Sequence, residues 1–238
     1  MKSEKSAPRA SRPKTAPKAP ARQPVPPPVI EMPMPPERLW LWALAAVGSL
    51  SLFIGGALIA VHHRITGLEL GAFRHINNLT DALRIPMLVG TIAPESLWIA
   101  VAVVVVTFLL KLYQVAWQLA AASIAGYGLA FIAKHEIARL RPGELLTGVH
   151  VRAHETGMGY PSGHTMIITV VTLVLFPYLP KGWRWAVLAL TPIVGFSRVY
   201  LGVHAPLDVA GGFAVGVFVV ACMRLLPARL RELLRFDS

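Results

Sequence analysis

The sequence predicts an all-α integral membrane protein: a six-helix transmembrane bundle that follows a disordered N-terminal tail. Two observations predict this class. More than half of the 238 residues (55%) are hydrophobic, which is above what a soluble domain of this length needs. These residues also gather into six runs with almost no charge, most of them close to the length of a helix that crosses a bilayer. A single cysteine excludes a disulfide framework and a thiolate metal cluster.

Residues 1–38 form the predicted tail, a cytoplasmic segment rich in proline, lysine and arginine. They include eleven prolines and eight of the 23 lysines and arginines, with few large apolar side chains to bury, a composition typical of disorder. Because much of the net charge of +11 belongs to this tail, we do not attribute it to nucleic-acid binding. We expect the tail to contact anionic lipid headgroups; an unidentified partner that docks on its Pro-Val-Pro-Pro-Pro stretch is the alternative.

Six apolar runs within residues 39–226 predict the membrane domain. The first, Leu39 to Val61, has 23 residues without a charge and includes Trp40 and Trp42, which suit the lipid–water interface. The others are Ile92 to Leu110, Val115 to Ala133, Ser162 to Leu179, Trp185 to Tyr200, and Ala205 to Leu226. Several are shorter than about 20 residues, which is tolerable where protein surrounds their ends. The polar segment His62 to Pro94 is expected to contain a short helix on the outer surface.

The distribution of basic residues predicts the orientation. With the N-terminal tail and the basic C-terminal tail (residues 227–238) in the cytoplasm, 15 basic residues lie inside and eight outside, in agreement with the positive-inside rule. All eight histidines then lie on the outer side or at its edge. The short loops suggest a bacterial protein. We therefore expect an inner-membrane protein whose histidine-containing site faces the extracytoplasmic side.

The first charged motif directly follows the third apolar run. Lys134 and Arg141 lie seven residues apart in the sequence KHEIARLRP, a separation of two helical turns. On a helix that continued through the motif, the two side chains would share a face and could bind the same anion. By itself this spacing is more typical of interfacial anchors at the end of a transmembrane helix.

The second motif, Pro161-Ser162-Gly163-His164, immediately precedes an apolar run. It is typical of a helix start, since Ser162 suits the N-cap position and Gly163 lets a ligand approach the backbone closely. Free N–H groups and the positive end of the helix dipole make such a corner an anion site. His164, in the first turn, could donate a proton to the bound anion; an N-cap followed by an interfacial histidine is the alternative.

The third motif, SRVYLGVHAPLD, connects the fifth and sixth apolar runs. Pro206 suits the first turn of the last helix, which places His204 before that helix and Asp208 within it. A carboxylate that bonds one ring nitrogen fixes the histidine tautomer and makes the other nitrogen a good nucleophile. A purely structural histidine–aspartate pair is the alternative, but it leaves the neighbouring Arg198 unexplained.

The topology brings the three motifs to the same side of the membrane. The first motif ends the third span and the second begins the fourth; the fourth and fifth spans then cross and return, which brings the third motif back. Charged groups at this depth are functional candidates because their burial is costly. One lysine, two arginines, two histidines and an aspartate beside a helix N-terminus predict a site for a tetrahedral anion, with a nucleophile and an acid.

Together the motifs resemble the three-part signature of the type 2 phosphatidic acid phosphatase superfamily, which includes membrane lipid phosphate phosphatases, glucose-6-phosphatase and the vanadium haloperoxidases. The resemblance covers about residues 39 to 226. The matching residues are Lys134, Arg141, Pro142, Pro161, Ser162, Gly163, His164, Ser197, Arg198, His204 and Asp208.

The resemblance implies a role for each of these side chains. His204 would attack phosphorus to form a phosphohistidine, with Asp208 orienting it, and His164 would protonate the leaving oxygen and later activate water. The phosphoryl oxygens would be bound by Lys134, Arg141, Ser162, Gly163 and Arg198. No metal ion or other cofactor is expected, since positive side chains can neutralise the phosphoryl charge.

The expected substrate is a lipid phosphate: a polyprenyl diphosphate, phosphatidylglycerophosphate or phosphatidate. The choice among them and the oligomeric state are left open. Two other functions also stay open, namely transfer of phosphate from the same phosphohistidine to an acceptor, and a non-enzymatic transporter or scaffold. Residues 143–159 are expected to form a loop over the site. Its His150, Arg152 and His154 are expected to be ordinary exposed residues, with headgroup recognition as the alternative.

Overall fold

The computed structural model describes residues 38–89 and 96–226, and every regular element in this part of the chain is helical. The C-terminal tail and nearly all of the N-terminal tail, both predicted from the sequence, lie outside the described residues. The helices are α1 (Leu39–Ala60), α2 (Gly67–Asn77), α3 (Arg84–Val89), α4 (Ser96–Leu109), α5 (Tyr113–Ile137), α6 (Pro142–Leu145), α7 (Gly163–Leu175), α8 (Lys181–Tyr200) and α9 (Pro206–Leu225), with 3-10 turns at Asp81–Leu83 and Phe176–Tyr178.

Six helices, α1, α4, α5, α7, α8 and α9, coincide with the six apolar runs. Within the described residues, α1, the stretch Tyr113–Leu145 and α9 are long and apolar enough to cross a membrane by length and composition. α4 and α7 are apolar but shorter, and residues 92–95 of the second run lie outside the described part. The all-helical class is therefore confirmed, whereas the number of spans stays a prediction.

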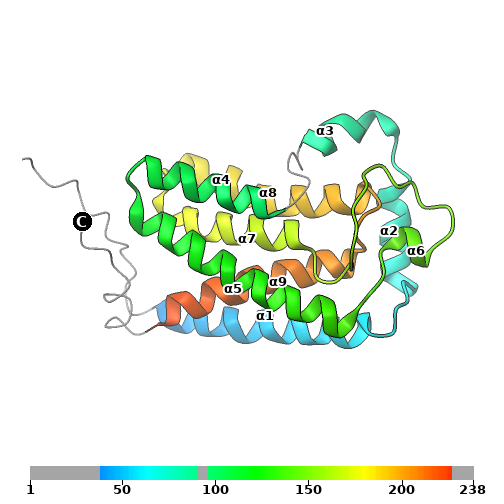
Figure 1. Cartoon of the computed structure of the whole chain (residues 1–238), viewed down its shortest axis with the longest axis horizontal. Helices are drawn as coiled ribbons and strands as arrows, with labels where there is room; N and C mark the ends of the chain where they lie inside the picture. The colour runs from blue at the N-terminus through cyan, green and yellow to red at the C-terminus, as the bar shows by residue number, and fades with distance from the viewer. Residues whose placement is uncertain (1–37, 90–95, 227–238) are drawn as a thin grey trace, which may run out of the picture. The chain divides into compact units, whose positions relative to one another are not determined.

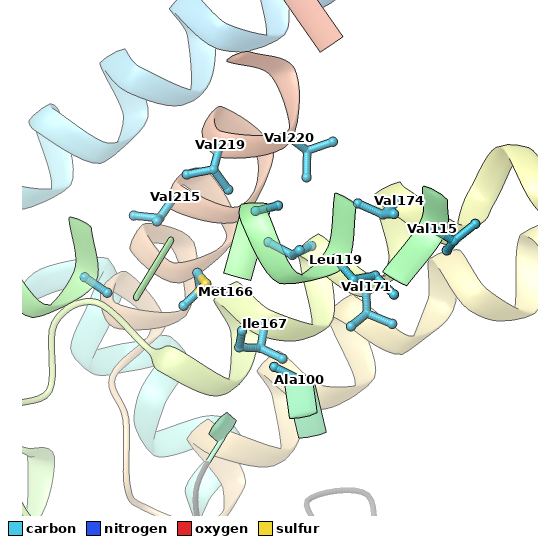
Figure 2. Close-up of a cluster of buried hydrophobic side chains, with 13 residues drawn as sticks. Ala100, Val115, Leu119, Met166, Ile167, Val171, Val174, Val215, Val219 and Val220 are labelled. Carbon is cyan, nitrogen blue, oxygen red and sulfur yellow. The ribbon is translucent and has the colours of Figure 1, made fainter. Parts of the chain in front are cut away.

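Helix α7 lies at the centre of the bundle. It contacts α4, α5, α8 and α9, and α9 also packs along α1 (Figure 1). Ten of the thirteen α7 residues are buried, because apolar side chains surround the helix instead of forming one stripe. Figure 2 shows part of this core, in which α5, α7 and α9 contribute Leu119, Met166, Ile167, Val171, Val174, Val215, Val219 and Val220.

Large apolar side chains also cover the outside of these helices. α1 and α4 in particular expose Trp40, Leu44, Leu58, Trp98 and Leu109. So much exposed apolar surface is rare on a soluble protein, and a bilayer is the environment that covers it. Together with the apolar helix lengths, this surface indicates an integral membrane protein.

Glycines in α9 allow this helix to approach α7 closely. A Cβ atom added at Gly212 would lie 2.2 Å from the carbonyl oxygen of Ser162, and one at Gly216 would lie 2.8 Å from the carbonyl oxygen of Met166. Backbone atoms would have to move to relieve either contact. The close approach fixes the start of α7, and with it the second motif, against α9.

We expect Gly212→Ala to lower the free energy of unfolding by about 1–3 kcal/mol, the cost typical of overpacking. Gly128→Ala in α5 is the matched control, because a Cβ atom added there meets nothing within 4 Å, and it should be neutral or stabilising by up to about 1 kcal/mol. Unfolding of the detergent-solubilised variants measures both effects. Equal effects of the two substitutions would contradict the close packing.

The polar segment between α1 and α4 contains α2 and α3, in agreement with the short helix predicted there. α2 contacts α8 and α9. Asn77 at the end of α2 donates to the carbonyl oxygens of Tyr200 and His150, and Glu69 accepts a hydrogen bond from the N–H of Leu207. α2 therefore lies beside the connection between α8 and α9, which carries the third motif.

Candidate active site

The three motifs meet where α5 ends and α7 and α9 begin, at the end of the bundle next to α2 (Figure 1). Nη1 of Arg141 lies 3.4 Å from Nε2 of His204 and 3.0 Å from Oε2 of Glu155. The Glu155 carboxylate also contacts Arg198 and lies 3.7 Å from Nδ1 of His164. Two arginines and two histidines, taken from all three motifs, therefore surround one carboxylate.

The first motif reaches this cluster differently from the way the sequence predicts. α5 ends at Ile137, and Ala138 takes a left-handed conformation with φ 49°. Lys134 and Arg141 therefore do not share the face of one continuous helix, and that expectation is wrong. Arg141 is extended, with φ −76° and ψ 159°, as residues before a proline tend to be. The turn of the chain, and not helical periodicity, brings the Arg141 guanidinium to His204.

The loop of residues 146–162 is held by the basic residues of the first motif. Arg141 donates from Nε to the carbonyl oxygen of Gly157 and from Nη2 to that of Thr156, at 2.9 and 3.0 Å. Nζ of Lys134 donates to the carbonyl oxygen of Met158 at 2.5 Å. Both side chains that were predicted to bind phosphate thus bond the loop backbone.

Helix α7 begins at Gly163 with Ser162 at the N-cap position, as predicted, but the Ser162 hydroxyl does not cap the helix. Its Oγ instead accepts a hydrogen bond from Oγ1 of Thr165 at 3.2 Å. The N–H of Ser162 donates to the carbonyl oxygen of Asp208 at 2.9 Å, which joins the start of α7 to the start of α9. His164, in the first turn, is buried beside Glu155.

His204 lies between the arginines and Asp208. Its Nε2 lies 3.4 Å from Arg141 and 3.8 Å from Oε2 of Glu155, whereas its Nδ1 lies 3.6 Å from Oδ2 of Asp208. The last distance is longer than a hydrogen bond. Asp208 therefore lies on the predicted side of the ring without bonding it, and a movement of less than an ångström would complete the bond.

The pKa of His204 lies well below the ordinary histidine value of 6.5. Burial is the main cause, because desolvation disfavours the charged imidazolium. The positive charges of Arg141, Arg198 and Lys134 lower the pKa further. The ring is therefore neutral at neutral pH, the state in which one ring nitrogen has a free lone pair.

Arg139 holds Asp208 in place, a role that the sequence alone does not predict. Its side chain is fully buried and donates from Nη1 to Oδ1 of Asp208 at 2.9 Å. Nη2 of Arg139 contacts Oε2 of Glu69 at 2.8 Å. Oδ2 of Asp208 also accepts the N–H of Ala205 at 2.8 Å. Asp208 is thus fixed from two sides, and Glu69 of α2 supports the arginine that fixes it.

Arg152 is not the ordinary exposed loop residue that the sequence predicts. Its side chain is 7% exposed, and Nε contacts Oδ1 of Asp81 at 2.8 Å. Nη1 donates to the carbonyl oxygen of Tyr200, and the guanidinium lies 4.3 Å from the centre of the Tyr200 ring. Arg152 therefore fastens the loop to the end of α8. His150 and His154 are exposed, as expected.

The positive charge at this site comes from basic side chains and not from a group of residues suited to a metal ion. Among residues 38–89 and 96–226, no three His, Cys, Asp or Glu side chains are grouped so that they could hold a metal ion. Arg141 and Arg198 are buried, and Lys134 acts on His204 through its charge. Guanidinium groups suit anions with several oxygens, such as carboxylates and phosphoryl groups.

Residues 115–231 match the model of the PAP2 superfamily. The chain is 30% identical over 127 residues to an undecaprenyl-diphosphatase of Sulfolobus acidocaldarius, an alignment that spans 52% of this chain and 61% of that protein. The fold is similar to that of LpxE from Aquifex aeolicus, with a TM-score of 0.61, 23% identity, and coverage of 67% of this chain and 96% of that one. It is also similar to a PAP2-type phosphatidylglycerolphosphate phosphatase of Bacillus subtilis, with a TM-score of 0.57, 24% identity, and coverage of 80% and 98%.

The fold and the site define an all-helical membrane protein in which three charged motifs meet at one end of an apolar bundle. Residues 115–231, which include all three motifs, match the PAP2 superfamily, that of the type 2 phosphatidic acid phosphatases. This match confirms the resemblance that the three motifs indicate.

Proposed function

We propose that the protein is a membrane phosphatase that hydrolyses the phosphate monoester or diphosphate of a lipid through a phosphohistidine on His204. The observation that carries this proposal is the convergence of Arg141, Arg198, His164 and His204 on one anionic group. Carboxylate and phosphoryl oxygens present similar acceptors to an arginine. The same four side chains therefore suit a phosphoryl group between a nucleophile and an acid.

His204 is the nucleophile of the proposed reaction. Its low pKa keeps the ring neutral, and its Nε2 is directed to the anion position. A bond forms between Nε2 and phosphorus while the bond from phosphorus to the leaving oxygen breaks, and Asp208 stabilises the positive charge that develops on the ring. His164 gives its proton to the leaving oxygen.

The second half of the reaction regenerates the enzyme. His164, now neutral, takes a proton from a water molecule, and the water oxygen attacks phosphorus. The bond between phosphorus and Nε2 breaks, which releases phosphate and free His204. Throughout, the phosphoryl charge is neutralised by Lys134, Arg141 and Arg198, with Ser162 and the N–H of Gly163 at the positive end of α7.

The site lies at the end of an apolar bundle, which favours a substrate whose hydrocarbon chain stays in the bilayer while its phosphate enters the site. The names of the relatives favour a polyprenyl diphosphate or phosphatidylglycerophosphate.

The distribution of basic residues favours an extracytoplasmic site, cytoplasmic termini and a bacterial inner membrane. In this proposal residues 39–226 form the phosphatase domain, residues 227–238 a second basic tail, and residues 1–38 a tail that contacts anionic headgroups.

Phosphate release by the detergent-purified protein, in EDTA, across a panel of lipid monophosphates and prenyl diphosphates tests the proposal. We expect release from at least one lipid, with prenyl diphosphates or phosphatidylglycerophosphate among the best. Release that needs an added divalent cation would contradict the cofactor-free mechanism. A phosphorylated acceptor in place of free phosphate would favour phosphotransfer. Loss of function on deletion of residues 1–38, but not in His204→Ala, would favour a transporter or scaffold.

The low pKa of His204 predicts how kcat/KM depends on pH. The neutral ring is the reactive form, and a lowered pKa means that protonation removes this form only at lower pH. We therefore expect the acid limb of kcat/KM to lie well below pH 6.5. Arg141→Gln removes a positive neighbour that lowers the pKa, so it should move the limb to higher pH while it lowers activity. An acid limb near pH 6.5 that Arg141→Gln leaves in place would contradict the prediction.

A further inference from the structure

The basic side chains that we assign to phosphate binding all contact the loop of residues 146–162. Lys134 donates to the loop backbone at Met158, and Arg141 donates to it at two positions. Arg141 and Arg198 both contact the Glu155 carboxylate from the same loop. A phosphoryl group that takes these donors must therefore displace contacts that the chain makes with itself.

The Glu155 carboxylate lies where a reacting phosphoryl group has to lie. Its Oε2 is 3.0 Å from Nη1 of Arg141 and 3.8 Å from Nε2 of His204, and its Oε1 is 3.7 Å from Nδ1 of His164. A phosphorus atom in position for attack lies about 3–3.5 Å from the nucleophile. The side chain is 14% exposed, so the carboxylate is inside the site. Glu155 and the phosphoryl group cannot occupy this position together.

We propose that Glu155 is a built-in competitor of the substrate, whose carboxylate sets which anions enter the site. The inference rests on the proposed function. A phosphate monoester or a terminal phosphate of a diphosphate carries up to two negative charges and three free oxygens, so it outcompetes a single carboxylate for the arginines. A phosphodiester carries one charge and two free oxygens and gains little over Glu155. The diester phospholipids that surround the protein are thereby kept out of the site.

The loop is built so that residues 155–158 can withdraw while the segments on either side stay in place; on the far side, the N–H of Gly159 donates to the carbonyl oxygen of Arg139. Arg152 fastens the first half through Asp81 and the carbonyl oxygen of Tyr200, and the N–H of His150 is bonded to Oδ1 of Asn77. These contacts do not involve the active site. Residues 155–158, in contrast, are held by Lys134, Arg141 and Arg198, which are the groups that a phosphate recruits. Binding of phosphate therefore releases residues 155–158.

Three variants of the full chain test this inference. Glu155→Gln removes the competing charge, Glu155→Asp keeps it, and Glu136→Gln is the matched control, because Glu136 is an exposed carboxylate in the last turn of α5. For each we would measure kcat, KM, and the inhibition constants of inorganic phosphate and of phosphatidylglycerol, a diester lipid, in mixed micelles.

We expect Glu155→Gln to lower the inhibition constant of phosphate on the order of 10-fold, the effect of removing a closed state that holds about nine-tenths of the molecules. Phosphatidylglycerol should inhibit Glu155→Gln and not the wild type. KM for the lipid substrate should fall together with the inhibition constant of phosphate, and kcat should change much less. Glu136→Gln should match the wild type, and Glu155→Asp should lie closer to the wild type than Glu155→Gln.

Other outcomes separate this inference from the proposed function. If the wild type hydrolyses a lipid phosphate and Glu155→Gln shows unchanged inhibition by both anions, only the role of Glu155 is overturned. A large loss of kcat with unchanged inhibition also overturns it, since Glu155 would then act in the chemistry. A wild type that neither turns over lipid phosphates nor binds inorganic phosphate overturns the function and the inference together.

Limited proteolysis of the wild-type protein gives a test that does not depend on a variant. Inorganic phosphate should speed cleavage after Glu155 by a glutamate-specific protease, because it displaces the contacts that the Glu155 carboxylate and the carbonyl oxygens of residues 156–158 make with the basic side chains. Unchanged or slower cleavage at saturating phosphate would overturn the inference.

Discussion

His204→Ala is expected to abolish turnover of the lipid substrate, with a loss on the order of 10⁴- to 10⁶-fold in kcat. The imidazole supplies the electron pair that forms the bond to phosphorus. The side chains around the anion position otherwise supply positive charge, in Arg141 and Arg198, or a proton, in His164. The affinity for inorganic phosphate, measured by direct binding, should change little, since both arginines remain.

Two further variants distinguish loss of the nucleophile from loss of the acid and from the removal of any histidine. His164→Ala removes the acid, so it should lose activity toward a lipid ester and keep much of it toward an aryl phosphate, whose leaving group needs no proton. His135→Ala, at an exposed histidine of α5, should behave as the wild type. Residual activity of His204→Ala within 100-fold of the wild type would contradict its assignment as the nucleophile.

Arg139→Met is expected to lower the free energy of unfolding by about 3–5 kcal/mol, the cost of leaving a buried charge without its partner. The side chains of Arg139 and Asp208 are both fully buried, and the side chain of Glu69 is only 15% exposed. The methionine would fill similar space without a charge. The two carboxylates would then lie close together with no positive charge between them.

A double-mutant cycle separates this pairing from simple loss of packing. Arg139→Met combined with Glu69→Gln should cost less than the sum of the two single changes, because each removes the partner of the other. Urea unfolding in detergent measures the three free energies. kcat should also fall in Arg139→Met while KM changes little, since Arg139 holds Asp208 and does not contact the anion position. Strictly additive free energies would contradict the network.

The helices and the meeting of the motifs could be predicted because long apolar runs fix the topology, and the topology fixes which helix ends lie together. The placement of Arg141 was predicted for the wrong reason. Ala138 gives no sequence sign of a left-handed turn, since glycine or asparagine usually takes that position. Arg141 nevertheless lies at the predicted site, because its long side chain reaches the end of the bundle from the turn.

The acidic residues of the site could not be predicted in the same way. Glu69 and Glu155 each stand alone in a polar segment. Arg139, the partner of Glu69, and Arg198, one of the two partners of Glu155, lie 70 and 43 residues away in the sequence. No periodicity links residues at such separations. Arg139 lies inside the first motif, but a third basic residue at the end of a span resembles an interfacial anchor. Its burial against Asp208 follows from the path of the chain, which only the fold provides.

Trapping of the phosphorylated protein tests the central claim most directly. The wild-type protein would be mixed with a radiolabelled lipid phosphate, quenched in alkali and digested, and the labelled peptide identified by mass spectrometry. We predict a label on His204 that is stable in base and lost in acid, with none on the His204→Ala protein. A label on another residue, or equal turnover by His204→Ala without any labelled protein, would contradict the phosphohistidine mechanism.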